Sequence, residues 1–475
     1  MKTLLIRPPP VHNILGKLIS SEVPLGLAYL ASYLEKKDQE VEILDLMLSN
    51  DPIKDLIKKI KQYKPDLFGL TAFTVEIFNA HRIARVIRKF SDAPIIIGGL
   101  HASALPIETL SEFKNFDIAV FGEGEIVLSN LISAMESNMD YSNIQGICYR
   151  NHNGKIRKNP PQPLIKNLDS LPFPARHKLA INKYRPLMEN YKQLPTTGVS
   201  TSRGCPYNCT FCSKSVYNKT YRYRSAENVI EELKECYYKF RIRDFKFYDE
   251  CMTVPRNRMI SLCQLILKEN LDISWNCYSR VDTINKNLLQ IMKSAGCYHV
   301  KYGVESGSNR VLKLMNKQIS LKQAVKTIKI TSKIGLSSKV SFMLGFPFET
   351  EEEIQKTINF SKYLSPDYVT FSITKPFPGT KIYIDALENG DLIHKNWQLY
   401  GLDSAPILKN QLDNKSLRNY IIKAYKEFYL RPQYFIKRIR RMINNPTTLE
   451  LKNNIRGLMV LLRSEITKQI ISKNE

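Results

Sequence analysis

Short apolar runs alternate with amphipathic stretches along most of this chain, and this alternation constrains the fold more than any other feature of the sequence. In the first part of the chain, runs typical of buried strands occupy residues 3–6, 41–46, 67–70, 95–97 and 118–121. Stretches with helical periodicity separate them, over residues 24–34, 53–60, 75–90 and 125–135. Strands that alternate with helices form parallel sheets covered on both faces. We therefore predict an α/β domain over residues 1–140, a doubly wound Rossmann-like parallel sheet that binds ligands at the carboxyl ends of its strands.

A second alternation follows, with strands expected at residues 198–203, 244–249, 273–278, 299–304, 339–345 and 368–374. Six strand–helix units predict a partial (β/α)6 barrel over residues 196–400, again with its site at the carboxyl ends of the strands. Residues 141–195 predict a hairpin at Asn153-Gly154 and then a proline-rich linker. Residues 401–475 carry no strand pattern and predict a basic helical C-terminal tail.

The chain is basic, but the excess charge is mostly spread along it. Its 475 residues include 70 Lys and Arg against 45 Asp and Glu, a net charge of +25. Because the excess is diffuse, we interpret it as solvated surface and predict no nucleic-acid partner. No apolar run reaches the ~18 residues that span a bilayer, and the N-terminus is typical of a strand rather than a signal peptide. The expected location is therefore the cytoplasm.

Three of the nine cysteines fall within eight residues, directly after the first predicted barrel strand: Cys205, Cys209 and Cys212. Without an export signal, disulfides are not expected. Three thiolates at this spacing can hold one side of a metal site. A structural zinc site needs four ligands, and no second Cys–Cys or Cys–His pair stands at ligand spacing. A cube of four irons held by three cysteines leaves one iron open for a small ligand; three unrelated buried cysteines are the remaining interpretation.

The CxxxCxxC string, with Phe211 before its last cysteine, resembles the signature of the radical S-adenosylmethionine (SAM) superfamily. The resemblance implies a [4Fe–4S] cluster whose open iron binds the methionyl amine and carboxylate of SAM. Reduction by an external donor such as flavodoxin or ferredoxin then cleaves SAM to a 5′-deoxyadenosyl radical. Five further segments match this family in order, at 245–250, 276–282, 303–308, 341–347 and 374–380. By resemblance, the residues at SAM are Phe211, Asp249, Glu250, Arg280, Glu305, Ser306 and Gly345.

Two of these residues have a clear chemical rationale. Arg280 could pair with the SAM carboxylate through two hydrogen bonds, and Glu305 could accept hydrogen bonds from the amine or the ribose. The alternative for both is an ion pair within the protein.

The first domain resembles the cobalamin-binding domain that precedes the barrel in one radical SAM subfamily, which contains cobalamin-dependent methylases and anaerobic tetrapyrrole-ester cyclases. The matching segments are 6–9, 24–30, 98–102, 121–125 and the joining segment 167–177. By resemblance, the residues at cobalamin are Pro8, Gly26, Thr71, Gly98, Gly99, His101, Gly122 and Glu123. The Asp-x-His-x-x-Gly string that places a histidine below cobalt is missing, so we expect cobalamin without a histidine ligand from that motif.

The same residues allow three other interpretations of the first domain. The glycine turns could serve strand-to-helix packing alone. A dinucleotide site is poorly supported, because the first strand ends in Pro8-Pro9-Pro10 rather than in a glycine-rich turn. A tRNA-directed methylthiotransferase would carry cysteines in its first domain, and here the first cysteine is Cys148.

Together these resemblances predict a cobalamin-dependent radical SAM enzyme that functionalises an unactivated carbon of a small molecule by methyl transfer. A ring-forming or oxygenating cyclase of the same family and a non-catalytic iron–sulfur regulatory protein are the alternatives. No motif in the sequence specifies the substrate. In the tail, residues 425–443 interleave aromatic and aliphatic residues with Arg and Lys, a pattern typical of an amphipathic helix on an anionic membrane surface. Such a surface would suit a hydrophobic substrate; the alternative is that these aromatics pack against the open end of the barrel.

Overall fold

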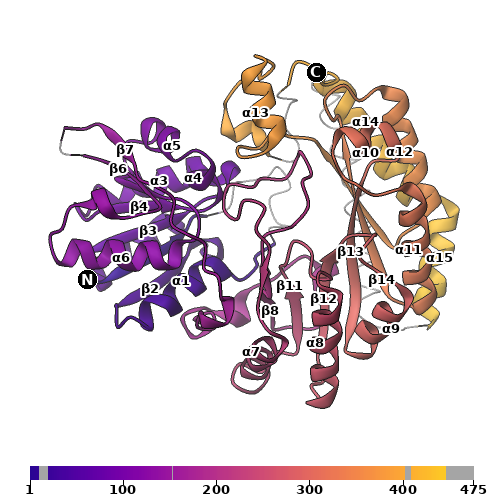
Figure 1. The fold of residues 1–475 in the computed structure, drawn as a ribbon, viewed down its shortest axis with the longest axis horizontal. Helices are drawn as coiled ribbons and strands as arrows, with labels where there is room; N and C mark the ends of the chain where they lie inside the picture. Colours follow the sequence, from indigo (N-terminus) through magenta and orange to yellow (C-terminus); the bar gives the residue numbers. More distant parts are fainter. Residues whose placement is uncertain (10–19, 152, 402–407, 445–475) are drawn as a thin grey trace.

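The computed structural model describes residues 1–9, 20–151, 153–401 and 408–444 of the chain. Two parts are visible in Figure 1, an N-terminal sheet with its helices and a curved second sheet whose helices lie outside it. The α/β fold class predicted from the sequence is confirmed, including the helical C-terminal region as far as it is described.

The N-terminal sheet has seven strands in the order β2-β1-β3-β4-β5-β6-β7. Its strands are β1 (Thr3–Arg7), β2 (Val41–Asp45), β3 (Leu67–Thr71), β4 (Ile95–Gly98), β5 (Ile118–Val120), β6 (Ile147–Arg150) and β7 (Ile156–Lys158). The first five are parallel, as predicted. The predicted hairpin forms β6 and β7, but it pairs antiparallel with β5 and extends this sheet. It thereby covers backbone groups of β5 that would otherwise form an open sheet edge.

Helices cover both faces of this sheet. They are α1 (Leu25–Glu35), α2 (Pro52–Tyr63), α3 (Ile77–Ile87), α4 (Leu100–Ala104), α5 (Pro106–Glu112) and α6 (Gly124–Glu136). Successive strand residues point to opposite faces. Ile95 and Ile97 therefore pack in a core with α2 to α5, whereas Ile96 packs in a second core with α1 and α6. The doubly wound arrangement follows from strands that are apolar on both faces.

The second sheet contains six parallel strands in the order β15-β14-β13-β12-β11-β8. They are β8 (Thr196–Val199), β11 (Asp244–Phe247), β12 (Ser274–Ser279), β13 (Cys297–Glu305), β14 (Ser337–Leu344) and β15 (Tyr368–Ile373). The helices of this part are α7 (Ala226–Tyr238), α8 (Arg256–Lys268), α9 (Lys286–Ser294), α10 (Asn309–Leu314), α11 (Leu321–Ile334), α12 (Glu351–Leu364) and α13 (Lys381–Glu388). The predicted partial barrel is thus present, with strand bounds within a few residues of those expected.

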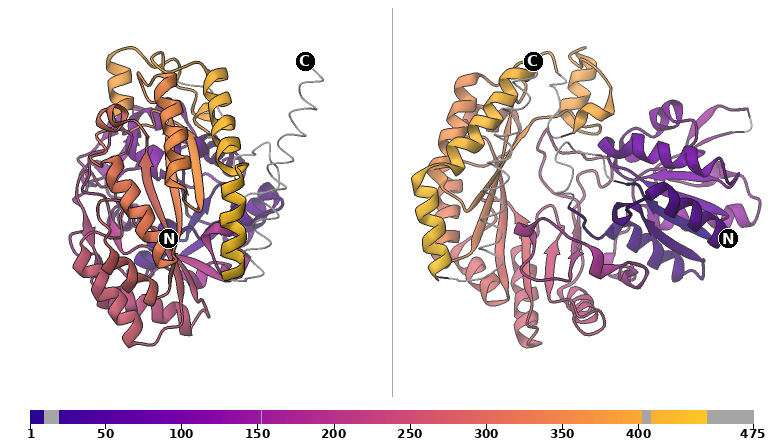
Figure 2. Two further views of the ribbon diagram at one scale, coloured as in Figure 1. Left: turned by 90° about the vertical axis from the view of Figure 1, so that its right-hand side faces the viewer. Right: turned by 180° about the vertical axis from the view of Figure 1, so that it is seen from behind.

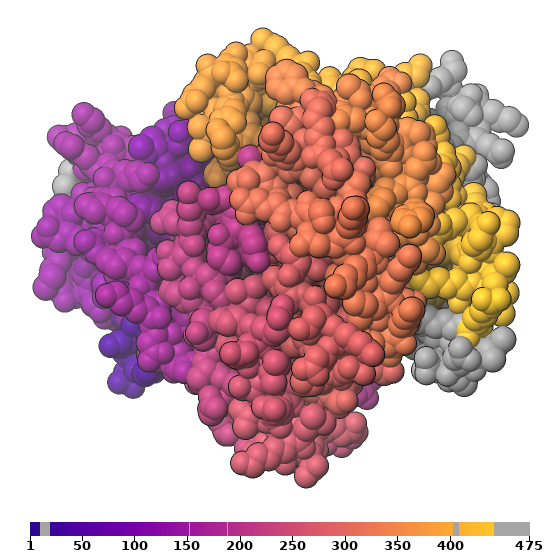
Figure 3. Space-filling view, turned by 45° about the vertical axis from the view of Figure 1, so that its right-hand side comes forward, coloured from indigo at the N-terminus to yellow at the C-terminus, as the bar shows by residue number. Residues whose placement is uncertain are grey.

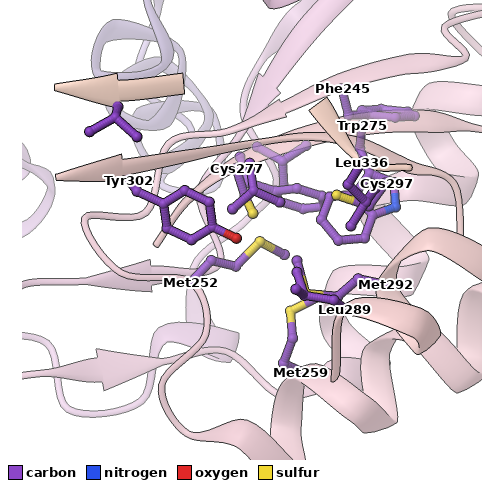
Figure 4. Close-up of a cluster of buried hydrophobic side chains, with 14 of the residues drawn as sticks. Phe245, Met252, Met259, Trp275, Cys277, Leu289, Met292, Cys297, Tyr302 and Leu336 are labelled. Atoms are coloured by element: carbon purple, nitrogen blue, oxygen red, sulfur yellow. The ribbon is translucent and has the colours of Figure 1, made fainter. Parts of the chain in front are cut away.

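The convex face of the barrel sheet packs against its helices in one apolar core. Figure 4 shows strand side chains such as Trp275, Cys277 and Tyr302 meeting Met259 and Leu289 from the helices. Four cysteines of this part behave as small buried hydrophobic residues here: Cys236, Cys263, Cys277 and Cys297. The concave face is therefore the one left for a site.

Two C-terminal helices, α14 (Asn414–Tyr429) and α15 (Pro432–Asn444), run along the outside of the barrel, with α14 against β15 (Figure 2). The last of the described residues, in yellow, lie on the surface of the molecule (Figure 3). The prediction of a single amphipathic helix over residues 425–443 is wrong, because two separate helices share this range. The helix ends before Pro432, because proline lacks the N–H that a continuing helix needs and disfavours helical backbone at the residue before it. Residues 445–475 of the predicted tail lie outside the described residues.

Tyrosine hydroxyls from α14 and α15 bond to the backbone of the edge strand β15. The Tyr429 hydroxyl accepts from the N–H of Val369 at 3.0 Å and donates to its carbonyl at 3.1 Å. Tyr425 bonds in the same way to Phe371, and Tyr434 donates to the Asp367 carbonyl. These three tyrosines therefore pack on the barrel as the alternative states, whereas Phe435 remains 42% exposed. The tyrosine hydroxyls pair with backbone N–H and C=O groups of the edge strand, which within the described residues has no neighbouring strand on this side because the barrel does not close.

We expect Tyr429→Phe to lower the free energy of unfolding by about 1–3 kcal/mol, because it leaves buried backbone groups of Val369 without partners. Urea unfolding followed by circular dichroism measures this. Tyr363→Phe is the matched control, since Tyr363 is 66% exposed and should change stability by no more than about 0.5 kcal/mol. Equal effects of the two substitutions would contradict the capping role.

Candidate active site

The three clustered cysteines lie on a loop at the carboxyl end of β8. Two short strands, β9 (Ser202–Arg203) and β10 (Arg222–Tyr223), pair antiparallel at its base. Gly204 begins the loop with φ +85°, and a Cβ atom there would lie 2.1 Å from the Thr220 carbonyl oxygen. Only glycine fits this position.

Asp249, predicted at SAM, fixes the start of this loop from the carboxyl end of β11. Its carboxylate accepts hydrogen bonds from the Thr201 N–H at 3.2 Å, from the Thr201 hydroxyl at 2.7 Å and from Ser202. It is 1% exposed. The neighbouring Glu250 is exposed. The structure therefore gives Asp249 a positioning contact and leaves Glu250 accessible.

Arg280 reaches from the end of β12 to the cysteine loop. Its guanidinium lies 3.6 Å from the centroid of the Tyr207 ring, and Nη1 lies 4.0 Å from the sulfur of Cys209. Two bonds of 2.9 Å pair it with Asp282. Both the interpretation as a ligand of SAM and the alternative of an internal ion pair thus have a basis in this geometry.

A second cation, Lys317, lies beside the same cysteines. Its ammonium is 3.0 Å from the Glu305 carboxylate and 5.7 Å from the centroid of the Phe211 ring. The pKa of the Cys209 thiol is lowered to about 6, mainly by a hydrogen bond from the Cys212 thiol, with Lys317 and Arg280 adding to the shift and burial opposing it. Cys209 is therefore biased toward the thiolate, the form that ligates iron.

Sequence reasoning missed Lys317, which follows α10. The one sequence feature related to Lys317 is Gly303, a glycine within the segment 303–308. In the structure, a Cβ atom at Gly303 would lie 2.2 Å from Glu305 Oε1 and 3.0 Å from Lys317 Nζ. That glycine makes room for the ion pair on the concave face.

Ser306 and Gly345 lie at the carboxyl ends of β13 and β14, as expected, but among protein contacts. Ser306 is 0% exposed, and its hydroxyl lies 3.2 Å from that of Thr357. Gly345 has φ +73°, and a Cβ atom there would lie 2.7 Å from Leu417 of α14. Any contact with SAM from these two residues stays a prediction.

The cobalamin residues predicted in the first domain gather at the carboxyl edge of its sheet. Thr71 ends β3, Gly98 ends β4, and Gly122 follows β5. Gly99 has φ +94°, and a Cβ atom there would lie 2.8 Å from Thr71 Oγ1. A Cβ atom on Gly122 would meet no atom within 4 Å, so the backbone of this turn is open to a bound group.

The other predicted cobalamin residues have different surroundings. Pro8, which follows β1, is buried, and Gly26 lies on the exposed side of α1. His101 is 1% exposed; its ring packs edge-on against Trp397 at 5.2 Å, and burial lowers its pKa to about 4. His101 is thus a neutral side chain packed between the first domain and the segment after α13.

Glu123 is the residue whose surroundings differ most from expectation. Its carboxylate binds Arg203 at 2.7 Å and Arg222 at 2.9 Å, and the adjacent Glu125 binds Arg203 at 2.5 Å. All four side chains are 10% exposed or less. We call these residues, Glu123, Glu125, Arg203 and Arg222, the interdomain clamp. It joins the start of α6 to the hairpin that carries the cysteine loop.

The chain matches two family models. The radical SAM superfamily model matches residues 199–361, and the B12 binding domain model matches residues 12–132. An uncharacterized methyltransferase of Pyrococcus horikoshii is 37% identical over 441 residues, which are 92% of this chain and 95% of that protein. The chain belongs to the cobalamin-binding radical SAM enzyme family. Its cofactors are a [4Fe–4S] cluster, S-adenosylmethionine and cobalamin.

Two further proteins are similar over most of their length. The anaerobic magnesium-protoporphyrin IX monomethyl ester cyclase of Rubrivivax gelatinosus is 28% identical over 90% of this chain and 78% of its own. The radical SAM methyltransferase TsrM of Kitasatospora setae superposes with a TM-score of 0.70 at 20% identity, covering 88% of this chain and 82% of its own. At that identity the likeness shows the fold.

The residues present fit these cofactors. Three thiols on one loop are a suitable donor set for a cluster. Within the described residues, no three His, Cys, Asp or Glu side chains are grouped closely enough to hold a single metal ion. Arg280 and Lys317 supply positive charge for an anionic ligand beside the cysteines, and the open backbone at Gly122 allows close approach of a large group.

We expect Cys205→Ala, Cys209→Ala and Cys212→Ala each to abolish most cluster incorporation, because each substitution removes a thiolate that we predict to ligate one iron. Iron and sulfide analysis after anaerobic reconstitution measures this. Cys148→Ala, in β6 of the first domain, is the matched control and should retain the full iron content. A triple variant that kept its cluster would exclude these ligands.

We expect Arg203→Met to lower the free energy of unfolding by about 3–5 kcal/mol, because it leaves two buried carboxylates with less than full pairing. Urea unfolding followed by tryptophan fluorescence is suitable, since Trp397 lies against the first domain. The control is Arg243→Met, whose pair with Asp272 is exposed and should contribute at most about 1 kcal/mol. A similar loss in both variants would refute a special role for the clamp.

Proposed function

We propose that this chain transfers a methyl group to an unactivated carbon of a small-molecule substrate, as a radical SAM C-methyltransferase. The observation that carries the proposal is the interdomain clamp. It holds the carboxyl edge of the cobalamin-binding sheet against the hairpin of the cysteine loop, with Arg203 only two residues before Cys205. The methyltransferase name of the relative from Pyrococcus horikoshii supports the same reaction.

When bound, the cluster with SAM supplies a hydrogen-abstracting radical, and cobalamin supplies a methyl carrier. The residues of the chain hold and orient the reactants. Arg280 and Lys317 would bind a carboxylate, and Glu305 would orient Lys317. The packing of His101, Trp397 and the clamp closes the domain contact and helps to keep water from the reacting carbon. An external one-electron donor must supply the electron.

A ring-forming cyclase is the second candidate, because the Rubrivivax gelatinosus cyclase matches nearly the whole chain. A non-catalytic iron–sulfur regulatory role is the third. Methyl transfer consumes a methyl group from SAM for each product, whereas ring formation leaves the carbon count of the substrate unchanged.

The test uses SAM labelled in its methyl group and the loaded enzyme under dithionite. We expect formation of 5′-deoxyadenosine and appearance of label first on cobalamin and then in small molecules from an anaerobic extract of a strain that lacks the gene. The optical spectrum of bound cobalamin should be base-off and unchanged in His101→Ala. Cys209→Ala should form no 5′-deoxyadenosine. Cleavage of SAM without label in any product would favour the cyclase, and no cleavage at all would favour the regulatory protein.

We also propose that α15 contacts an anionic membrane surface. No helix in the described ranges is both long and apolar enough to cross a bilayer. Leu430, Phe435, Ile436 and Ile439 are each 42–52% exposed. Arg440 is exposed near them, whereas Lys437 turns back to Asp367.

We expect co-sedimentation with anionic liposomes at low salt and release as salt rises, because salt screens attraction to the lipid headgroups. Replacing Phe435, Ile436 and Ile439 by Ser should abolish binding. A matched triple replacement of exposed Lys322, Lys326 and Lys329 on α11 by Ser should have little effect. Binding that persists in the α15 variant would rule out this surface.

A further inference from the structure

One layer of side chains crosses the concave face of the barrel sheet below the cysteine loop. In the strand register Tyr278 lies beside Lys301, Lys301 beside Lys339, and Lys339 beside Tyr368. We call these four residues the lysine layer. Tyr278 is 39% exposed although it lies on a central strand, so water reaches this face.

The next layer toward the cysteine loop is lined by small residues. Gly303 lies beside Ser341, and Ser341 beside Thr370. All three are partly exposed, whereas Val304 and Phe342 on the opposite face are 0% exposed against the helices. The space beside Gly303 is taken by the Glu305–Lys317 pair. The small, partly exposed side chains of Ser341 and Thr370 line the concave face between that pair and the lysine layer.

Cations outnumber anions around Tyr278. Lys339 pairs with Glu189 at 2.5 Å, and Lys246 pairs with Glu22 at 2.8 Å. Lys301, 3% exposed, donates to Asn190 Oδ1 at 2.7 Å and to Asn276 Oδ1 at 2.8 Å. Within the described chain it has no carboxylate within ion-pair distance. Three ammonium groups thus face two carboxylates, and burial of a cation without an anion is costly.

The Lys339–Glu189 pair is the accessible part of this group. Its side chains are 19% and 20% exposed, and Glu189 belongs to a single turn, Met188–Asn190. A carboxylate on such a turn can exchange for one from a ligand without disturbing the sheet.

We propose that the lysine layer is a substrate subsite for a carboxylate or phosphate group, which Lys301 and Lys339 bind over the ring of Tyr278 in competition with Glu189. The proposal rests on the proposed function and names its substrate class. Lys301 precedes Glu305 by four residues on β13, about 13 Å along a strand. A substrate bound here is therefore an anion that extends about that far from its anionic group toward Glu305 and the cysteine loop.

The pH dependence follows from the surroundings of Lys301. Burial, and then the charge of Lys246, lower its pKa to about 7. Lys339, Glu189 and Glu22 also face it. Above pH 7 the free enzyme loses this positive charge, so affinity for an anion should fall as pH rises from 6 to 8.

The experiment measures binding of benzoate and of neutral benzyl alcohol to the cluster- and cobalamin-loaded enzyme by anaerobic calorimetry. We expect saturable binding of benzoate and none of the alcohol. Lys301→Met and Lys339→Met should each weaken benzoate binding about 10-fold or more, since each removes a charged partner. Glu189→Gln should strengthen it several-fold, because the competing carboxylate is gone. Lys322→Met, an exposed lysine on α11, is the matched control and should change nothing.

Competition with inorganic phosphate distinguishes the two sources of the anionic group. Displacement of benzoate indicates a general oxyanion site, and failure to displace it indicates a carboxylate site. Three results would overturn the proposal: no saturable benzoate binding up to about 10 mM, benzoate binding in both lysine variants as tight as in the unsubstituted enzyme, or weaker binding in Glu189→Gln. Failure of the proposed function is a separate result, because formation of 5′-deoxyadenosine needs SAM and the cluster but no substrate anion.

Discussion

The interdomain clamp is the interaction on which the rest of the structure depends. Two glutamates at the start of α6 meet two arginines of the hairpin that carries the cysteine loop, all nearly excluded from water. Buried charges are tolerated only when they are paired with good geometry. The two domains therefore have little freedom to slide against each other without exposing or unpairing these groups. A reaction that passes a group between two large cofactors needs such a fixed separation. A second buried group, Glu232 between Arg176 and Arg224, ties the linker to α7 in the same way.

The barrel separates apolar and polar chemistry between its two faces. Its convex face is packed with Trp275, Tyr302 and other apolar side chains against the helices. Its concave face carries three cations. Lys246 pairs with Glu22 from the segment before α1, and Arg280 pairs with Asp282 just after β12. Lys301 donates to Asn190 of the linker and Asn276 of β12. Because strand residues alternate between faces, one strand such as β13 serves both purposes. The open edge that a partial barrel leaves at β15 is satisfied by the tyrosines of α14 and α15.

Two cations and two glycines of the barrel shape the surroundings of the cysteine loop. Arg280 and Lys317 place positive charge beside Cys209 and Cys212, where the thiolate-bound cluster and the carboxylate of SAM would bring negative charge. A side chain at Gly303 would collide with the Glu305–Lys317 pair, and one at Gly204 would collide with the Thr220 backbone at the base of the cysteine loop. The cations come from β12 and from the segment after α10, so the site exists only when the barrel is complete.

The sequence alone determined the order of strands and helices, the place of the cysteine loop after β8 and the family, because periodicity and ligand spacing are local properties of the chain. It also predicted which residues stand at strand ends. Which side chains contact each other across the two domains was decided only by the tertiary structure. The sequence places Glu123 near the end of β5. It does not predict the ion pair with Arg203, 80 residues away, because the residues next to a charged side chain do not specify its distant partner. The same holds for His101 against Trp397 and for Lys317 beside Cys209. Pro432 is the counterexample, a local signal of a helix break that the broader amphipathic pattern obscured. Local chemistry thus decided the elements and the predicted cysteine ligands, and long-range burial decided which charged side chains bind one another.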